Sequence, residues 1–86
     1  MTERRDHRYL PGFAEMAKHR QALTEALVAR RVEAGLSQTE VGARMGTSQS
    51  AVARLETGQA DVRMSTLERY AAAVGQVIDW RLGRPR

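Results

Sequence analysis

The stretch from Gln38 to Gly58, QTEVGARMGTSQSAVARLETG, contains two short helical patterns separated by a glycine. Val41 and Met45 are four residues apart, so they lie on one face of a first helix. Gly46 can end this helix, because glycine enters the left-handed conformation without a steric cost. Two helices joined by such a short turn form a helix-turn-helix.

The second helical pattern begins just after this glycine and has its own buried stripe. Thr47 or Ser48 can cap the helix, and Val52 and Leu55 follow at a spacing of three. Gly42, in the first pattern, lacks a side chain and so allows the second helix to cross close by. The stretch therefore predicts the complete helix-turn-helix, with its second helix starting near Ser48.

Polar side chains occupy the faces of the second helix that the apolar stripe leaves over. They are Ser48, Gln49, Ser50 and Arg54. Glutamine pairs bidentately with adenine and arginine with guanine, and serine pairs with either. A recognition helix contacts bases mainly through its N-terminal residues. A solvated polar helix start is the alternative interpretation, but together with the turn glycine the pattern favours DNA binding.

The segment LSQTEVGARMGTSQSAVARLETG resembles the Cro/phage-repressor type of helix-turn-helix, known as the XRE family. The resemblance extends from about Leu27 to Gly75. It implies that Gln38 opens the first helix of the motif and holds a DNA phosphate. It also implies that the polar residues of the second helix face bases, and that Thr57 contacts the DNA backbone beyond that helix.

The same resemblance implies an internal ion pair. In this family an arginine before the motif commonly pairs with a glutamate at its end, and here these residues are Arg31 and Glu56. Spacing alone does not show the pair. Thr47 departs from the family pattern, in which many members have an apolar residue, and we expect a slight loss of core packing there.

The composition fits a small helical protein with a polyanionic partner. Its 86 residues form one small domain, and with 42% hydrophobic but only 5% aromatic residues the core must be aliphatic, as in an all-α helical bundle. The formal charge of +4 and the pI near 10.6 suit double-stranded DNA. No apolar run is long enough to span a membrane and the N-terminus is no signal peptide, so we expect a cytoplasmic, nucleoid-associated protein.

The sequence shows no arrangement typical of catalysis or metal binding. Without cysteine the chain has no disulfide framework, no thiolate nucleophile and no zinc finger. His7 and His19 are its two histidines, and neither stands in a His/Asp/Glu grouping with ligand spacing. We therefore expect neither an enzyme nor a bound metal or cofactor.

Three regions follow one another along the chain. Residues 1–12 are expected to form a flexible N-terminal arm, because they are charged and lack periodicity up to a Pro-Gly turn. Residues 13–75 form the helix-turn-helix domain, and residues 76–86 form a C-terminal dimerisation strand and tail.

Further helices are expected on both sides of the motif. The pattern is helical from residue 13 up to Gly35, the predicted C-cap, and an interruption near His19 leaves one helix or two open. After the motif, Ser65 and Glu68 have the spacing of a capping box, so we expect a helix over residues 66–74. Its predicted buried face comprises Leu67, Tyr70, Ala71 and Val74.

The C-terminal segment combines strand and helix features. Ile78, Trp80 and Leu82 alternate with other residue types as in a strand, whereas a helix would gather Val74, Val77, Ile78 and Leu82 on one side. Its shortness and its Val and Ile content favour the strand. A lone strand needs a partner chain, so these three apolar residues are predicted to form a homodimer across a two-fold axis. The alternative places Trp80 against the first helix as part of the core.

Two functions follow from these patterns. The main one is a sequence-specific DNA-binding transcriptional regulator, a dimeric repressor that reads a palindromic operator. The segment LERYAAAVG, followed by an apolar strand, also resembles the HigA-type antitoxins, which are XRE-family proteins that repress their own operon and bind a neighbouring toxin. The alternative is therefore an antitoxin that binds a RelE/HigB-like toxin protein and represses its own operon.

Overall fold

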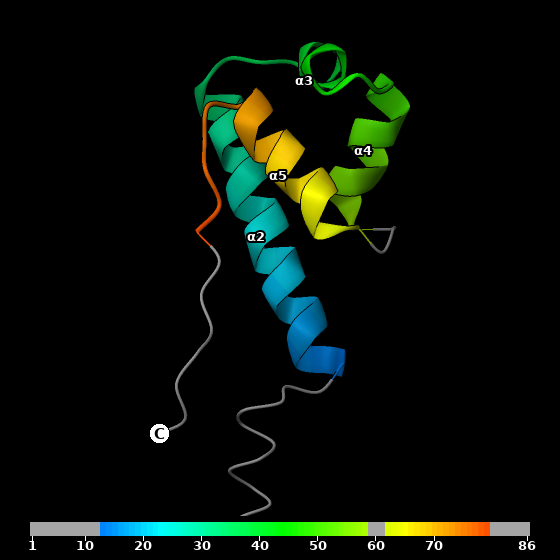
Figure 1. Ribbon diagram of the computed structural model, residues 1–86, viewed down its shortest axis with the longest axis vertical. Helices are drawn as coiled ribbons and strands as arrows, with labels where there is room; N and C mark the ends of the chain where they lie inside the picture. The colour runs from blue at the N-terminus through cyan, green and yellow to red at the C-terminus, as the bar shows by residue number, and fades with distance from the viewer. Residues whose placement is uncertain (1–12, 59–61, 80–86) are drawn as a thin grey trace, which may run out of the picture.

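A computed structural model describes residues 13–58 and 62–79 of the chain, with side chains from residue 18 onward. The described residues form helices in the order α2 (Phe13–Glu33), α3 (Gln38–Met45), α4 (Gln49–Thr57) and α5 (Met64–Ala73) (Figure 1). The expected all-α fold is confirmed, and α3 and α4 form the helix-turn-helix. The expected arm over residues 1–12, together with Trp80 and Leu82, lies outside the described residues.

α2 is one continuous helix, so it runs through His19 without a joint. The side that it turns toward the other helices carries Thr24 and Leu27, both buried, with Arg31 partly buried one turn further on. These positions are three or four residues apart and therefore share one face of the helix. Gly35, just beyond the end of α2, adopts the left-handed conformation at φ 73°, as its predicted capping role requires.

Side-chain caps and a glycine set the limits of α3 and α4. Ser37 and Glu40 form a capping box, in which Ser37 Oγ accepts from the Glu40 backbone N at 3.0 Å and Glu40 Oε1 accepts from the Ser37 backbone N at 2.8 Å. Gly46 ends α3 in the left-handed conformation at φ 75°. Of the two residues proposed as cap for the next helix, Ser48 has this role, since its Oγ accepts from the backbone N of Ala51.

α5 begins at Met64, two residues earlier than expected, so the predicted cap at Ser65 is wrong. Arg63 is the N-cap residue, and no side chain caps this helix. Ser65 instead lies exposed within the first turn. The predicted buried face of the helix is confirmed by the burial of Leu67, Tyr70, Ala71 and Val74.

The helices enclose a small, largely aliphatic core. α4 and α5 both pack against α2, and α3 packs against α4 and α5 (Figure 1). Every described helix therefore contributes to one cluster, and the helix-turn-helix forms one end of it. The buried hydrophobic residues are Leu27, Val41, Met45, Val52, Leu55, Leu67, Tyr70, Ala71, Ala73 and Val74.

Residues 76–79 return along α2 on the flank away from α4 (Figure 1). Their backbone is neither helix nor strand. Ile78 is partly buried against the core of its own chain, whereas Val77 is 92% exposed. Trp80 and Leu82 lie beyond these residues, so the dimerisation strand stays a prediction.

We expect Gly42→Ala to destabilise the domain, measured as the free energy of unfolding in urea. A Cβ at Gly42 would lie 3.0 Å from the backbone O of Thr47 and 3.2 Å from that of Ser48, in the turn that leads into α4. To remove these close contacts the turn must move, which costs about 1–3 kcal/mol of folding free energy. This cost exceeds the roughly 0.5–1 kcal/mol by which alanine stabilises a helix relative to glycine. Ala43→Gly, at an exposed position of the same helix, is the control for propensity alone. A stabilised Gly42→Ala variant would contradict the close approach.

Candidate nucleic-acid interface

The outward face of α4 carries Ser50, Arg54 and Thr57, which are all exposed. Their spacing of four and then three residues places them opposite Val52, which is buried in the core. Gln49, the first residue of α4, is exposed on a flank next to this face. One helix therefore presents these four side chains to the solvent.

All three hydroxyl groups predicted to contact DNA have partners within the chain. Ser48 is the N-cap of α4, and its Oγ also lies 3.2 Å from the Oγ of Ser50. Thr57 Oγ1 donates to the backbone O of Arg54 at 3.0 Å. Ser48 thus has a structural role at the start of the helix.

Gln38 connects the exposed start of α4 to the interior. Its Oε1 accepts from Nε2 of Gln49 at 2.7 Å, and its Nε2 donates to Oε1 of Glu56 at 2.9 Å. Because a carboxylate only accepts hydrogen bonds, the amide of Gln38 must turn its nitrogen, rather than its oxygen, toward Glu56. The Gln38 oxygen then faces Gln49 and determines the orientation of that amide as well.

The Glu56 carboxylate is the centre of this network. Its Oε2 accepts from Nε of Arg31 at 2.6 Å and from the hydroxyl of Tyr70 at 2.5 Å, and its Oε1 accepts from Nη2 of Arg31 at 3.0 Å. The side chains of Arg31 and Glu56 are only 14% and 7% exposed. Arg31 Nη1 also donates to the backbone O of Leu36 at 2.9 Å. Arg31 and Glu56 therefore form a bidentate, largely buried ion pair.

Burial and hydrogen bonding have opposite effects on the carboxyl group. Burial raises the pKa of Glu56, whereas hydrogen bonds from Arg31, Tyr70 and Gln38 lower it. The lowering is larger in sum, so the pKa of Glu56 lies below the ordinary value. The hydrogen bond to Glu56 raises the pKa of Arg31. Burial, together with the bond to Glu56, raises the pKa of Tyr70. At neutral pH the network therefore holds an ionised carboxylate, a charged guanidinium and a neutral phenol.

Two polar contacts were not expected from the sequence. The sequence pattern places Tyr70 only in the core. A buried phenol usually needs a hydrogen-bond partner, and this need could have indicated that Tyr70 donates to a buried acceptor such as Glu56. Arg44 in α3 donates to the backbone O of Ala73 at the end of α5, at 2.8 Å. No local pattern indicates this second contact, which links two helices far apart in the chain.

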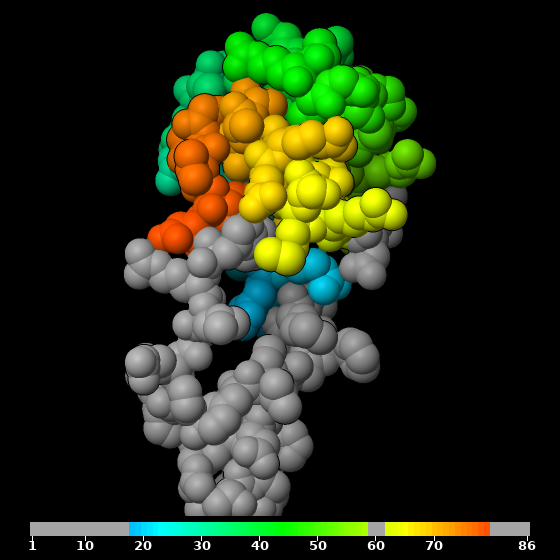
Figure 2. All heavy atoms as spheres, in the orientation of Figure 1, coloured from blue at the N-terminus to red at the C-terminus, as the bar shows by residue number. Residues whose placement is uncertain are grey.

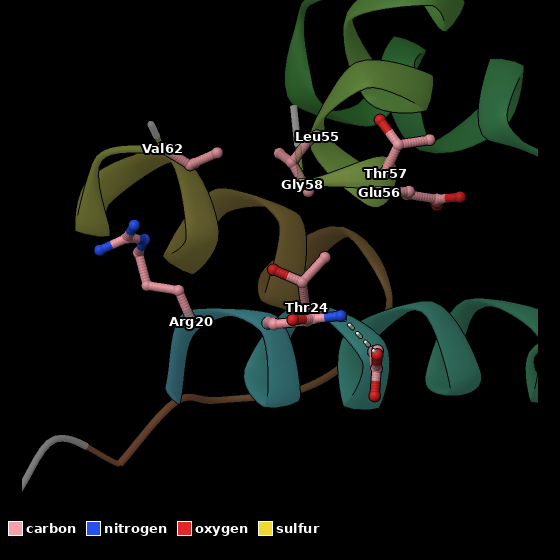
Figure 3. A pocket seen from close by; sticks show the side chains of 9 residues that line it. Arg20, Thr24, Leu55, Glu56, Thr57, Gly58 and Val62 are labelled. Atoms are coloured by element: carbon pink, nitrogen blue, oxygen red, sulfur yellow. Dashed lines mark hydrogen bonds between the residues drawn. The ribbon is translucent and has the colours of Figure 1, made fainter. Parts of the chain in front are cut away.

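A cleft of about 390 Å³ lies between α2 and the C-terminal end of α4 (Figure 3). Arg20 and Thr24 line it from α2, and Glu56 and Thr57 line it from α4. The cleft is thus at the C-terminal end of α4, toward α2, whereas the exposed start of α4 lies at the other end of that helix.

Two general features bear on the class of site. In the described part of the chain, no group of three His, Asp or Glu side chains could hold a metal ion. No helix of that part is long and apolar enough to cross a membrane.

Comparison with known protein families agrees with the helix-turn-helix seen in the structure. Residues 27–80, more than half of the chain, match the model of the helix-turn-helix family, and the chain belongs to that family. The resemblance to the XRE type stated from the sequence is confirmed.

Individual relatives of the chain indicate a narrower group within this family. The chain is similar to antitoxin HigA1 of Mycobacterium tuberculosis, in strains CDC 1551 / Oshkosh and ATCC 25618 / H37Rv, with 43% identity over 63 residues in each case. The matched part covers 73% of this chain but 42% of each relative, so the chain spans less than half the length of these relatives. No solved structure matches the chain.

We expect the Glu56 network to make stability depend on acid pH. The pKa of Glu56 is lower in the folded chain than the value of about 4.3 expected when unfolded. Its stabilisation is therefore complete above that value and is lost as the pH falls through the folded pKa. Urea unfolding from about pH 7 down to about pH 3 should show this loss in the wild type and a shallower dependence in Glu56→Gln.

At neutral pH, Glu56→Gln and Arg31→Ala should each cost about 2–3 kcal/mol, because each leaves a largely buried charge without its partner. Glu33→Gln is the control: Glu33 pairs with Arg30 on the surface, so its loss should change stability by less than about 1 kcal/mol. Equal effects of Glu56→Gln and Glu33→Gln would refute a structural role for the buried pair.

Proposed function

We propose that this chain is a sequence-specific DNA-binding transcriptional regulator, a dimeric repressor that reads a palindromic operator through α4. Membership of the helix-turn-helix family supports this class of function. Within the chain, the proposal rests on the hydrogen-bonded pair of Gln38 and Gln49 at the exposed start of α4.

The two glutamines retain groups that match a base and a phosphate. One N–H of Gln49 is bound to Gln38, so Gln49 keeps its Oε1 and a second N–H for a base. Adenine presents a donor and an acceptor side by side in the major groove, which a glutamine amide complements. Gln38 keeps one N–H besides the one that Glu56 accepts, and this N–H suits a phosphate oxygen.

The rest of the outward face supports the same partner. Arg54 follows Ser50 by one turn, and its guanidinium can pair bidentately with guanine. Thr57 lies one turn further along, where the DNA backbone would pass the end of α4. The formal charge of +4 favours the approach to a polyanion.

A palindromic operator needs two copies of the chain, because its half-sites lie about 34–36 Å apart and each recognition helix reads only one of them. We propose that Ile78, Trp80 and Leu82 form the homodimer contact. Val77, next to Ile78, is 92% exposed, so an apolar side chain in this region is available for such a contact. Ile78 itself packs partly on its own core, so it would link that core to the partner.

The second candidate function is that of an antitoxin, which the 43% identity to antitoxin HigA1 favours. The chain would then bind a RelE/HigB-like toxin protein and repress its own operon through the same DNA contacts. A small RelE-like ribonuclease reading frame beside the gene, whose product copurifies with this chain, would identify the antitoxin. Both functions place the protein at the nucleoid in the cytoplasm, and neither calls for catalysis or a cofactor.

We expect Gln49→Ala and Arg54→Ala each to weaken operator binding by roughly 1–3 kcal/mol and to relax the preference at one base pair. Gln38→Ala should instead weaken binding to all sequences about equally, since it removes a phosphate contact. Selection from randomised duplexes, followed by titration of the selected site, measures both effects. Gln21→Ala, an exposed glutamine on α2, is the control. Unchanged affinity and preference in Gln49→Ala and Arg54→Ala would refute the proposed reading face.

We expect truncation before Gln76 to leave a folded monomer with much weaker operator binding. The reason is that the truncation removes all three residues of the proposed dimer contact. Sedimentation gives the mass in solution, and circular dichroism reports whether the domain is folded. A truncated chain that still sediments as a dimer and binds normally would contradict the proposal. An unfolded one would support the alternative in which Trp80 belongs to the core.

A further inference from the structure

The cleft between α2 and the end of α4 is lined mostly by side chains that the proposed DNA interface does not use. Its volume of about 390 Å³ falls within the range of about 300–1,000 Å³ that is typical of small-molecule sites. Figure 3 shows Arg20 and Thr24 extending from α2 toward Val62 and the last residues of α4, and Figure 2 shows the rest of this face. The cleft is therefore large enough for a compact ligand held between two helices.

The α2 wall of the cleft lies outside the part of the chain that matches the helix-turn-helix family. The match covers residues 27–80. α2 contributes Arg20, Gln21, Thr24 and Glu25 to the cleft, and all four precede residue 27. The cleft is therefore completed by a part of the chain that the family match does not reach.

Two opposite charges stand on this wall, five residues apart. Arg20 and Glu25 both line the cleft and are exposed to solvent. Five residues rise about 7.5 Å along a helix, a span that two long side chains can close around one small molecule. Arg20 already takes part in an interaction, and Glu25 Oε2 accepts from Nε2 of Gln21 at 3.3 Å. Since a guanidinium has five N–H donors and a carboxylate has several acceptor sites, both can bind a ligand as well.

The end of α4 adds a second negative element to the cleft. The C-terminal end of a helix carries about half a negative charge, and α4 ends at Thr57, which lines the cleft. Glu56 also lines it, but its carboxylate is paired with Arg31 and adds little further charge. The cleft thus offers a cationic group at Arg20 and anionic groups at Glu25 and the end of α4.

Apolar and hydroxyl groups complete the lining. Leu55 and Val62 provide apolar surface, and Thr24 and Thr57 provide hydroxyl groups. Thr24 is only 7% exposed and lies on the side of α2 that faces the other helices. Such positions are usually apolar, so Thr24 places a polar group where packing alone does not require one.

We propose that this cleft binds an aliphatic α-amino acid. The ligand carboxylate would pair with Arg20, and the ammonium group would face Glu25 and the end of α4. The ligand side chain would pack on Leu55 and Val62. A purely anionic ligand would meet Glu25 and a purely cationic one would meet Arg20, so a zwitterion matches the charges best. This inference does not depend on DNA binding and adds a small-molecule ligand to the macromolecular partners proposed above.

The test is a titration of the full chain with L-leucine, followed through the NMR shifts of its backbone amides. The amides of Thr24 and Gly58 should shift in a saturable way, since both residues line the cleft. Isocaproate lacks the ammonium group of leucine, and isoamylamine lacks its carboxylate. Each should bind at least about tenfold more weakly, because it has lost one charge-assisted contact.

Arg20→Gln and Glu25→Gln should each weaken leucine binding by a similar factor, because each removes one charged partner of the ligand. Arg30→Gln and Glu33→Gln are the matched controls. They make the same charge changes on α2 at residues that pair with each other on the surface and line no part of the cleft. Both controls should bind leucine as the wild type does, and thermal melts should show that all four variants are folded.

Three outcomes would overturn the proposal. The first is the absence of saturable shifts with leucine, isoleucine, valine and methionine alike. The second is equal affinity for leucine and either of its two half-ligands. The third is an equal loss in Arg20→Gln and Arg30→Gln, which would report total charge rather than a site. Because the titration contains no DNA, its outcome is separate from that of the proposed DNA-binding function.

Discussion

The Glu56 carboxylate, on α4, is hydrogen-bonded to a side chain of each of the other three described helices. It stands near the end of α4 and accepts hydrogen bonds from Arg31 of α2, Gln38 of α3 and Tyr70 of α5. A buried carboxylate without such partners is strongly destabilising. The folded chain must therefore bring these donors to one point, and this requirement restricts how α4 can be oriented against the other helices.

The same requirement extends to the proposed DNA-binding surface. Gln38 belongs both to the buried network and to the proposed interface, because one end of its amide contacts Glu56 and the other contacts Gln49. The amide of Gln49 is thus oriented before any base is present. Preorganised side chains lose less conformational freedom on binding, so the interaction that holds the helices together would also favour the proposed reading of bases by Gln49.

Sequence reasoning was reliable where the cause is local, and it failed where two local signals were equivalent. Gly46 and Ser48 limit the two motif helices as their residue types predict, since a left-handed glycine and a hydroxyl cap act on adjacent backbone. The spacing of a capping box occurs at both Ser37 and Ser65. The structure forms the box only at Ser37, because α5 starts before Ser65 and leaves it inside the first turn.

The sequence by itself determined the helix-turn-helix, its apolar stripes and the polar residues left on α4, because each follows from periodicity and turn chemistry over a few residues. The pairing of Arg31 with Glu56 came from family resemblance, since 25 residues separate them and no helical period relates them. Only the tertiary structure decided that Tyr70 and Gln38 share the same carboxylate, and that Arg20 of α2 lines one cleft with the end of α4. Such contacts depend on the angles between packed helices, and those angles arise from the whole core rather than from any single segment.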